Sequence, residues 1–88
     1  MQRVKQVRYL HDYTVELVFK SGEVRYADLA TYVGGEGIFD ALTDVSYFKK
    51  VTMNEVGNSI CWPNGVDFCP NLLYDISFPV GKEAEVTG

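Results

Sequence analysis

The stretch "YTVELVFKSGEVRYADL" (residues 13–29) decides the fold. Apolar residues occupy every second position from Tyr13 to Phe19, with polar residues such as Glu16 between them. This period of two predicts a half-buried β-strand. The turn "KSGE" (20–23) follows, in which Gly22 can adopt positive φ, and the sequence then resumes as a second strand over 23–29. The stretch therefore predicts an antiparallel hairpin.

The sequence on either side of this hairpin adds further elements. Residues 4–10 are rich in β-branched and aromatic side chains, and the polar pair at positions 11–12 predicts a tight turn before the next strand. A loop leads to a predicted short helix over 37–42, and Asp44 can cap the turn that follows. Residues 51–62 then favour two strands around the turn "EVGN".

These elements predict an α+β fold. We expect a small, mainly antiparallel β-sheet of about five strands that begins with an N-terminal meander, and one or two short helices packed on it. With 88 residues the chain forms one domain, which we place at 1–80, and the polar segment 81–88 is expected to be a frayed tail.

Composition narrows the classes of function. The formal net charge is −4, so direct binding to DNA or RNA is not expected. The basic residues are expected to lie singly on solvent-facing sides of strands, and the alternative is a mild basic patch of Arg3, Lys5, Arg8, Lys20 and Arg25. No apolar run is long enough to cross a bilayer, and the first ten residues have no signal-peptide core. We therefore expect a cytoplasmic protein with no membrane association.

The least generic stretch is "SICWPNGVDFCPNLLYDIS" (59–77). The pair Asn64-Gly65 predicts a tight turn with at least one residue at positive φ. Pro70 suits the first turn of a helix that Asp67 or its neighbourhood would cap. Trp62 is expected to be buried. The structural motif comprises Trp62, Pro63, Asn64, Gly65, Asp67, Pro70, Leu73 and Tyr74, and Leu73 or Tyr74 should cover the indole.

The two cysteines in this stretch are interpreted as small buried hydrophobic residues that stay reduced. If positions 64 and 65 formed a strict two-residue hairpin loop, Cys61 would oppose Phe68 and Cys69 would oppose Ile60. The thiols would then point to opposite faces, so a disulfide between them is not expected.

The residues with chemical potential do not form a recognised catalytic pattern. His11 beside Asp12 could suggest a general base, but neighbours in sequence are typical of a surface turn, and no catalytic, cofactor-binding or metal-binding residue is predicted. The alternative remains a small-molecule-binding or enzymatic domain that uses His11, Asp12, Asp67 and Trp62.

An interaction surface is the other possibility that the residues support. A small sheet leaves a face or an edge open, and exposed edges can pair with a partner's strand. Residue types enriched at interfaces occur at Tyr9, Tyr13, Tyr26, Tyr32 and Trp62, although for each ring taken alone a place in the core is favoured.

The sequence resembles an uncharacterised bacterial family, the domain of unknown function 2442. The resemblance covers residues 4–75 and is carried by "L.F..GE.R..DL" (17–29), by "L.D…F..V" (42–51) and above all by "WPNGVDFCPNLLY" (62–74). It implies a small α+β fold with a mainly antiparallel sheet, and a link to bacterial two-gene modules of toxin–antitoxin type. It implies no catalytic residue, and Asn71 stands where the family pattern commonly has an acid.

We therefore expect a non-enzymatic protein-interaction domain of a bacterial cytosolic protein, antitoxin-like within a two-gene toxin–antitoxin-type module. The expected partner is another small protein encoded nearby. Whether the chain also forms a homo-oligomer is left open.

Overall fold

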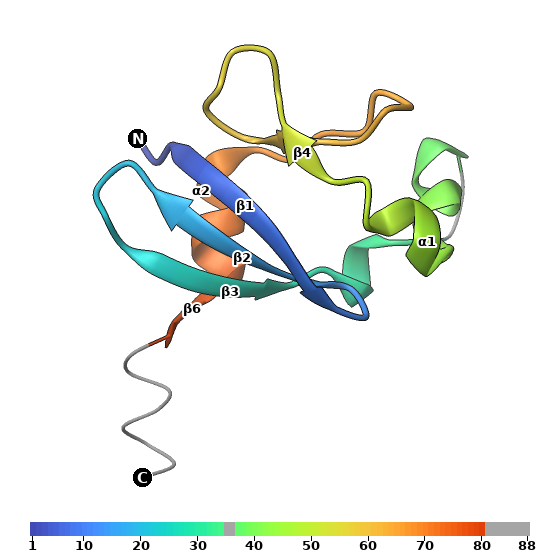
Figure 1. Ribbon diagram of the computed structural model, residues 1–88, viewed down its shortest axis with the longest axis horizontal. Coiled ribbons are helices and arrows are strands. Elements are labelled where there is room, and N and C mark those ends of the chain that lie inside the picture. Colours follow the sequence, from blue (N-terminus) through green and yellow to red (C-terminus); the bar gives the residue numbers. More distant parts are fainter. Residues whose placement is uncertain (35–36, 81–88) are drawn as a thin grey trace, which may run out of the picture.

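The N-terminal third of the chain is a three-stranded meander (Figure 1). The computed structural model describes residues 1–34 and 37–80. Strands β1 (Val4–His11), β2 (Thr14–Phe19) and β3 (Val24–Asp28) pair antiparallel in chain order. The predicted meander is therefore confirmed, with each strand end within one residue of its expected place.

The two turns of the meander both use left-handed backbone. Asp12 has a φ of 46° between β1 and β2, and Gly22 has a φ of 96° between β2 and β3. Aspartate is one of the few residues with a side chain that tolerates this conformation, and glycine has no Cβ to clash. The residue types at the turns therefore set the two short connections.

The strands divide between two sheets. Strand β6 (Phe78–Pro79) pairs with β3 and completes a four-stranded sheet of order β1-β2-β3-β6, while β4 (Thr52–Met53) and β5 (Ile60–Cys61) form a separate two-stranded sheet. The fold class is the predicted α+β class with a mainly antiparallel sheet. Strand β6 was not predicted, because two residues carry no periodicity and one of them is a proline. Proline is tolerated there because β6 is an edge strand.

The segment between the sheets consists of short helical turns. The 3₁₀ helices η1 (Ala30–Tyr32) and η2 (Gly37–Thr43) precede helix α1 (Val45–Phe48), so the helix expected over 37–42 is present in 3₁₀ form. Asp44 caps α1 as predicted: its Oδ1 accepts from Ser46 N (3.0 Å) and Ser46 Oγ (2.7 Å). These hydrogen bonds from Ser46 lower the pKa of the Asp44 carboxyl.

Helix α2 (Pro70–Ile76) covers one face of the sheet and lies behind the strands in Figure 1. Pro70 occupies the first helical turn as predicted, but the cap is Cys69, which makes no side-chain cap hydrogen bond. The prediction that Asp67 caps this helix is wrong. Asp67 is exposed and forms a β-bridge with Cys61, so it belongs to the preceding hairpin.

The core lies between the four-stranded sheet and the elements that pack on its inner face. Alternate residues of β2 are fully buried at Val15, Leu17 and Phe19, as the period of two predicts. Phe19 meets Tyr74 of α2 edge-to-face, with ring centroids 5.3 Å apart. The buried hydrophobic residues are Val4, Val15, Leu17, Phe19, Ala27, Leu29, Leu42, Phe48, Ile60, Trp62, Val66, Phe68 and Leu73.

A buried cation ties the end of α2 to β3. The Arg25 side chain is 11% exposed; its Nε donates to Ser77 Oγ (2.7 Å) and its Nη2 to Ser77 O (2.6 Å). Its Nη1 donates to Glu23 Oε2 (2.6 Å), and the guanidinium stacks on the Tyr74 ring at 4.1 Å. The Tyr74 hydroxyl donates to Glu23 Oε1 (2.9 Å). We call these four residues the Arg25 clamp.

The clamp shifts the titration of its members. The hydrogen bond from Arg25 lowers the pKa of Glu23, and the hydrogen bond to Glu23 raises the pKa of Tyr74. Because the folded-state pKa of Glu23 lies below its unfolded value, this group stabilises the fold above that unfolded value. Its contribution is lost as the pH falls through the folded-state pKa.

Replacing Arg25 by Ala should lower the free energy of unfolding by roughly 2–4 kcal/mol, because it removes several charge-assisted hydrogen bonds from a buried site. Urea denaturation measures the loss. Arg8→Ala is the matched control: Arg8 also pairs with a glutamate, Glu16, but its side chain is 61% exposed, so the loss should be much smaller than that of Arg25→Ala. Equal losses for the two variants would show that the clamp does not hold the fold.

Candidate functional site

The Trp62 motif forms a hairpin with a three-residue loop. Gly65 N donates to Trp62 O (3.0 Å), and Trp62 N donates to Val66 O (2.9 Å). Gly65 has a φ of 95°, so the predicted tight turn with a residue at positive φ is confirmed. This geometry fits a three-residue hairpin loop with its left-handed residue at the end.

The strict two-residue pairing considered for this hairpin is wrong. Cys61 opposes Asp67 and not Phe68. The reason is that Pro63 joins the loop, since its fixed φ suits the first central position of a turn and it has no N–H for a ladder. Both cysteines are free thiols, as predicted. The prediction that both are buried is wrong for Cys69, which is exposed, and Cys61 is only half-buried.

Trp62 is a core residue. Its side chain lies among the fully buried ones, with the residue 2% exposed, and its Nε1 donates to Phe48 O (2.9 Å). The rings of Phe48 (5.4 Å) and Phe68 (5.7 Å) pack against it. Burial was predicted correctly, but these two rings, and not Tyr74, make its aromatic contacts. Tyr74 packs instead on Phe19.

The rest of the motif holds the backbone in place. Leu73 is the buried residue of α2, and Asn64 Oδ1 accepts from Val66 N (3.2 Å) across the hairpin loop. The exposed members are Pro63, Asn64, Gly65 and Asp67, and the half-buried members are Pro70 and Tyr74. The motif therefore builds a hairpin and a helix start, and its side chains do not converge on one point.

The residues of the alternative site are also dispersed. His11 Nδ1 lies 3.3 Å from Asp12 Oδ2 in the first turn of the meander, and the two side chains are 69% and 86% exposed. Asp67 is exposed in the hairpin, and Trp62 is buried. Within residues 1–34 and 37–80, no three His, Cys, Asp or Glu side chains gather as a metal ion would require. No hydrogen bond that the structure shows joins the His11–Asp12 pair to the other two residues.

The feature that does collect surface side chains is the outer side of the four-stranded sheet. Since Val15, Leu17 and Phe19 face the core, their neighbours on β2 face outward. The strand register then aligns a row across all four strands: Arg8 opposes Glu16, Glu16 opposes Tyr26, and Tyr26 opposes Phe78. We call the outward side the open face, and its residues are Gln6, Arg8, Glu16, Val18, Val24, Tyr26 and Phe78.

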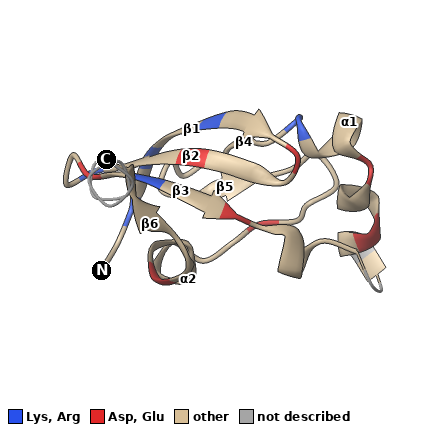
Figure 2. Ribbon diagram, turned by 90° about the horizontal axis from the view of Figure 1, so that it is seen from below, with Lys and Arg blue, Asp and Glu red and all other residues tan. Residues whose placement is uncertain are grey.

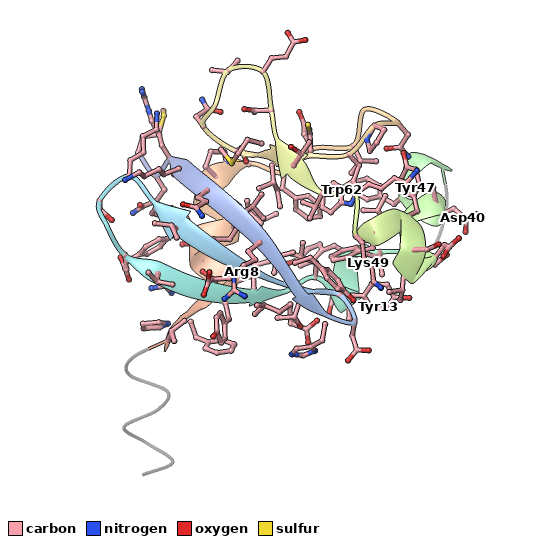
Figure 3. All side chains as sticks on the ribbon, viewed as in Figure 1. Arg8, Tyr13, Asp40, Tyr47, Lys49 and Trp62 are labelled. Atoms are coloured by element: carbon pink, nitrogen blue, oxygen red, sulfur yellow. The ribbon has the colours of Figure 1, made fainter. Side chains whose placement is uncertain are left out.

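The open face combines exposed apolar groups with a satisfied ion pair. Phe78 is 41% and Val24 is 37% exposed, and the Phe78 ring meets Tyr26 edge-on at 6.1 Å. Arg8 donates to both carboxylate oxygens of Glu16, each at 3.1 Å. No described helix lies in front of these strands in Figure 1, and Figure 3 shows Arg8 well apart from Trp62.

Sequence reasoning found only part of this surface. Tyr26 was among the aromatic candidates, but Tyr9 and Tyr13 pack on Phe48 at the inner side, and Trp62 is buried. Phe78 was missed, because its place depends on the unpredicted strand β6. The alternation of β2 could have identified the outward positions on that strand.

Basic residues line β1 in spite of the acidic composition (Figure 2). Arg3 and Lys20 adjoin through a backbone hydrogen bond, and Lys49 Nζ lies 5.7 Å from the centroid of the Tyr9 ring. Figure 3 labels Lys49 beside α1. We call this group the basic edge, and it comprises Arg3, Lys5, Arg8, Lys20 and Lys49. Arg25, which the sequence grouped with these bases, is buried in the clamp instead.

The comparisons with known proteins give one match. The family model described as "Protein of unknown function (DUF2442)" matches residues 4–79. No curated protein and no solved structure matches the chain. In the two described stretches of the chain, every helix is too short or too polar to cross a bilayer.

Replacing Trp62 by Ala should lower the free energy of unfolding by about 3–5 kcal/mol, because it leaves a large cavity between Phe48 and Phe68. Trp62→Phe loses the hydrogen bond to Phe48 O and part of the ring volume but keeps an aromatic ring in the core, so a smaller loss is expected. Thermal and urea denaturation measure both. Val56→Ala, at a site 79% exposed, is the control that should change little. A Trp62→Ala protein as stable as the parent would contradict a core role for the indole.

Replacing Gly65 by Ala should cost roughly 1 kcal/mol or more of stability through backbone conformation alone. A Cβ added at Gly65 would meet no atom within 4 Å, so no steric clash contributes. Gly65→Asn should lose less, since Asn tolerates positive φ better than Ala. Partner binding measured at low temperature should be retained in both variants. Lost binding with unchanged stability would make the hairpin tip a recognition site.

Proposed function

The chain belongs to the family of proteins of unknown function designated DUF2442, and from this premise we propose that it is a non-enzymatic protein-interaction domain of the bacterial cytosol. The open face is the proposed contact surface. The observation that carries the proposal is the cross-strand row on this face, in which the exposed Phe78 and Tyr26 lie beside the Arg8–Glu16 pair.

The physical reason is the cost of exposed apolar surface. Removing it from water contributes about 25 cal/mol per Å² of apolar surface, against which the entropic cost of association acts. Aromatic residues are enriched at the centres of interfaces, where polar neighbours form the rim. Phe78 and Val24 supply the apolar centre here, and Arg8 with Glu16 supplies a rim whose charges already satisfy each other.

We propose that the occupant of the open face is another small protein, encoded beside this one in a two-gene module of toxin–antitoxin type. This chain would be the antitoxin-like component. Its support is the acidic net charge of −4, which disfavours direct contact with nucleic acid, together with the family resemblance. The free thiols Cys61 and Cys69 are compatible with a reducing cytosol.

An enzymatic or small-molecule-binding role has less support. The rings of Phe48 and Phe68 pack against Trp62, and its Nε1 already donates to the backbone carbonyl of Phe48. The His11–Asp12 pair lies in solvent, where a base has no positioned nucleophile or substrate proton to act on.

The experiment is affinity capture from the native host, followed by reconstitution with the purified captured protein. The parent should retain one protein in fixed ratio. The double variant Tyr26→Thr/Phe78→Thr removes both rings from the open face and keeps β-branched residues in the strands, so it should bind at least tenfold more weakly. Val56→Ala is the matched control, since Val56 is 79% exposed and lies off the sheet.

Two results would overturn the proposal. In the first, no captured protein depends on the rings of Tyr26 and Phe78 for its retention, while melting curves show that both variants are folded. The other is light scattering that finds a stable dimer of this chain dissociated by the same double variant. In that case the open face would bind a second copy and not a different protein.

A further inference from the structure

We propose that strand β1 is a docking edge for an extended acidic segment of the partner, which would add to the sheet as a fifth strand. This inference rests on the proposed function, because it specifies how part of the same partner is held. It concerns the backbone of β1 and the basic edge around it, and the exposed rings of the open face are not needed for it.

Strand β1 lies at one edge of the four-stranded sheet, opposite β6, and at eight residues it is the longest of the described strands. Alternate backbone N–H and C=O groups of an outer strand point away from the sheet and can pair with an added strand.

Part of the outer edge of β1 is already covered. Val4 N donates to Asn58 O (2.8 Å) and β4 packs beside β1, so the β4–β5 hairpin occupies the start of the edge. Beyond it, in the part of the chain that the structure describes, residues 5–11 make no backbone hydrogen bond outside the β1–β2 ladder. Irregularities between Val4 and Gln6 and between Tyr9 and His11 bound a regular stretch over 6–9.

The side chains around this edge are mainly basic. The basic edge holds five of the eight Lys and Arg residues of a chain whose net charge is −4. Within the described residues, only Arg8 of this group forms a salt bridge. Arg3, Lys5, Lys20 and Lys49 are exposed. Cations that lack acidic neighbours attract an acidic ligand over several ångströms and fix its position along the strand.

The charge also selects among occupants. An antiparallel pair of β1 strands from two copies would bring Lys5 and Arg8 close to the same bases of the second copy, and like charges on opposed strands are destabilising. A strand that alternates Glu with Val meets the bases with opposite charge, and its backbone pairs with the edge. Lysines and bulges also serve to protect an edge from any pairing, and a protected edge would bind no strand.

The test uses defined peptides and the full chain labelled with ¹⁵N. The probe is an octapeptide of alternating Glu and Val, and its controls are a Lys–Val octapeptide and the same Glu–Val peptide N-methylated at alternate residues. The Glu–Val peptide should shift the amide resonances of residues 5–10, slow hydrogen exchange of the outward amides of β1, and bind more weakly as salt is raised. The N-methylated peptide, which cannot complete the ladder, should bind at least tenfold more weakly.

A matched pair of charge reversals tests the basic edge. Lys5→Glu should weaken binding of the Glu–Val peptide at least tenfold. Lys50→Glu, the same change at a base over the Tyr47 ring in the segment after α1, should leave the affinity within twofold.

Four outcomes would overturn the inference: no binding of the Glu–Val peptide, equal binding of its N-methylated form, equal effects of the two reversals, or tighter binding of an oligothymidylate than of the peptide. The last would mark β1 as a site for single-stranded nucleic acid. Partner capture by the Tyr26→Thr/Phe78→Thr variant is a separate measurement that does not involve β1. Rejection of the β1 docking edge would therefore leave the proposed function standing.

Discussion

The Arg25 guanidinium is the point on which the arrangement of the C-terminal part depends. It is an inward-facing cation in a strand whose other inward residue, Ala27, belongs to the apolar core. A cation in such a place is stable only if its donors are satisfied, and Ser77 and Glu23 accept from it while Tyr74 covers its face. Satisfying this one group fixes the end of α2 against β3.

The open face depends on the same contact. Because Ser77 is held by Arg25, the next residue, Phe78, is placed opposite Tyr26 as strand β6. The ring that carries the proposed function is therefore positioned by a polar network on the inner side of the sheet. Trp62, in contrast, joins α1 to the second sheet, because its indole donates to Phe48 O and packs on the ring of Phe68.

The features predicted correctly are those whose cause lies within a few residues. The period of two in β2, the Asp44 cap, the left-handed glycines at positions 22 and 65, and the proline that opens α2 all act locally. What was missed depends on distant partners. Strand β6 exists because Ser77 meets Arg25, 52 positions away, and the hairpin register shifted because Pro63 entered the loop. The candidate surface was predicted only as an open sheet, since its key ring, Phe78, lies on that unpredicted strand.

The separation between the two ends of the clamp also bears on synthesis of the chain. The meander is complete by Asp28 and needs only near neighbours to pair, so it can form while the polypeptide is still being made. Its inner side, however, carries Val15, Leu17 and Phe19, and α2 reaches that side only after residue 76 has been added. Until then a nascent chain exposes the apolar inner side of the sheet, and the Arg25 guanidinium is held by water and Glu23 in place of Ser77. The ribosome-bound form is thus the state in which most of the future core still faces solvent.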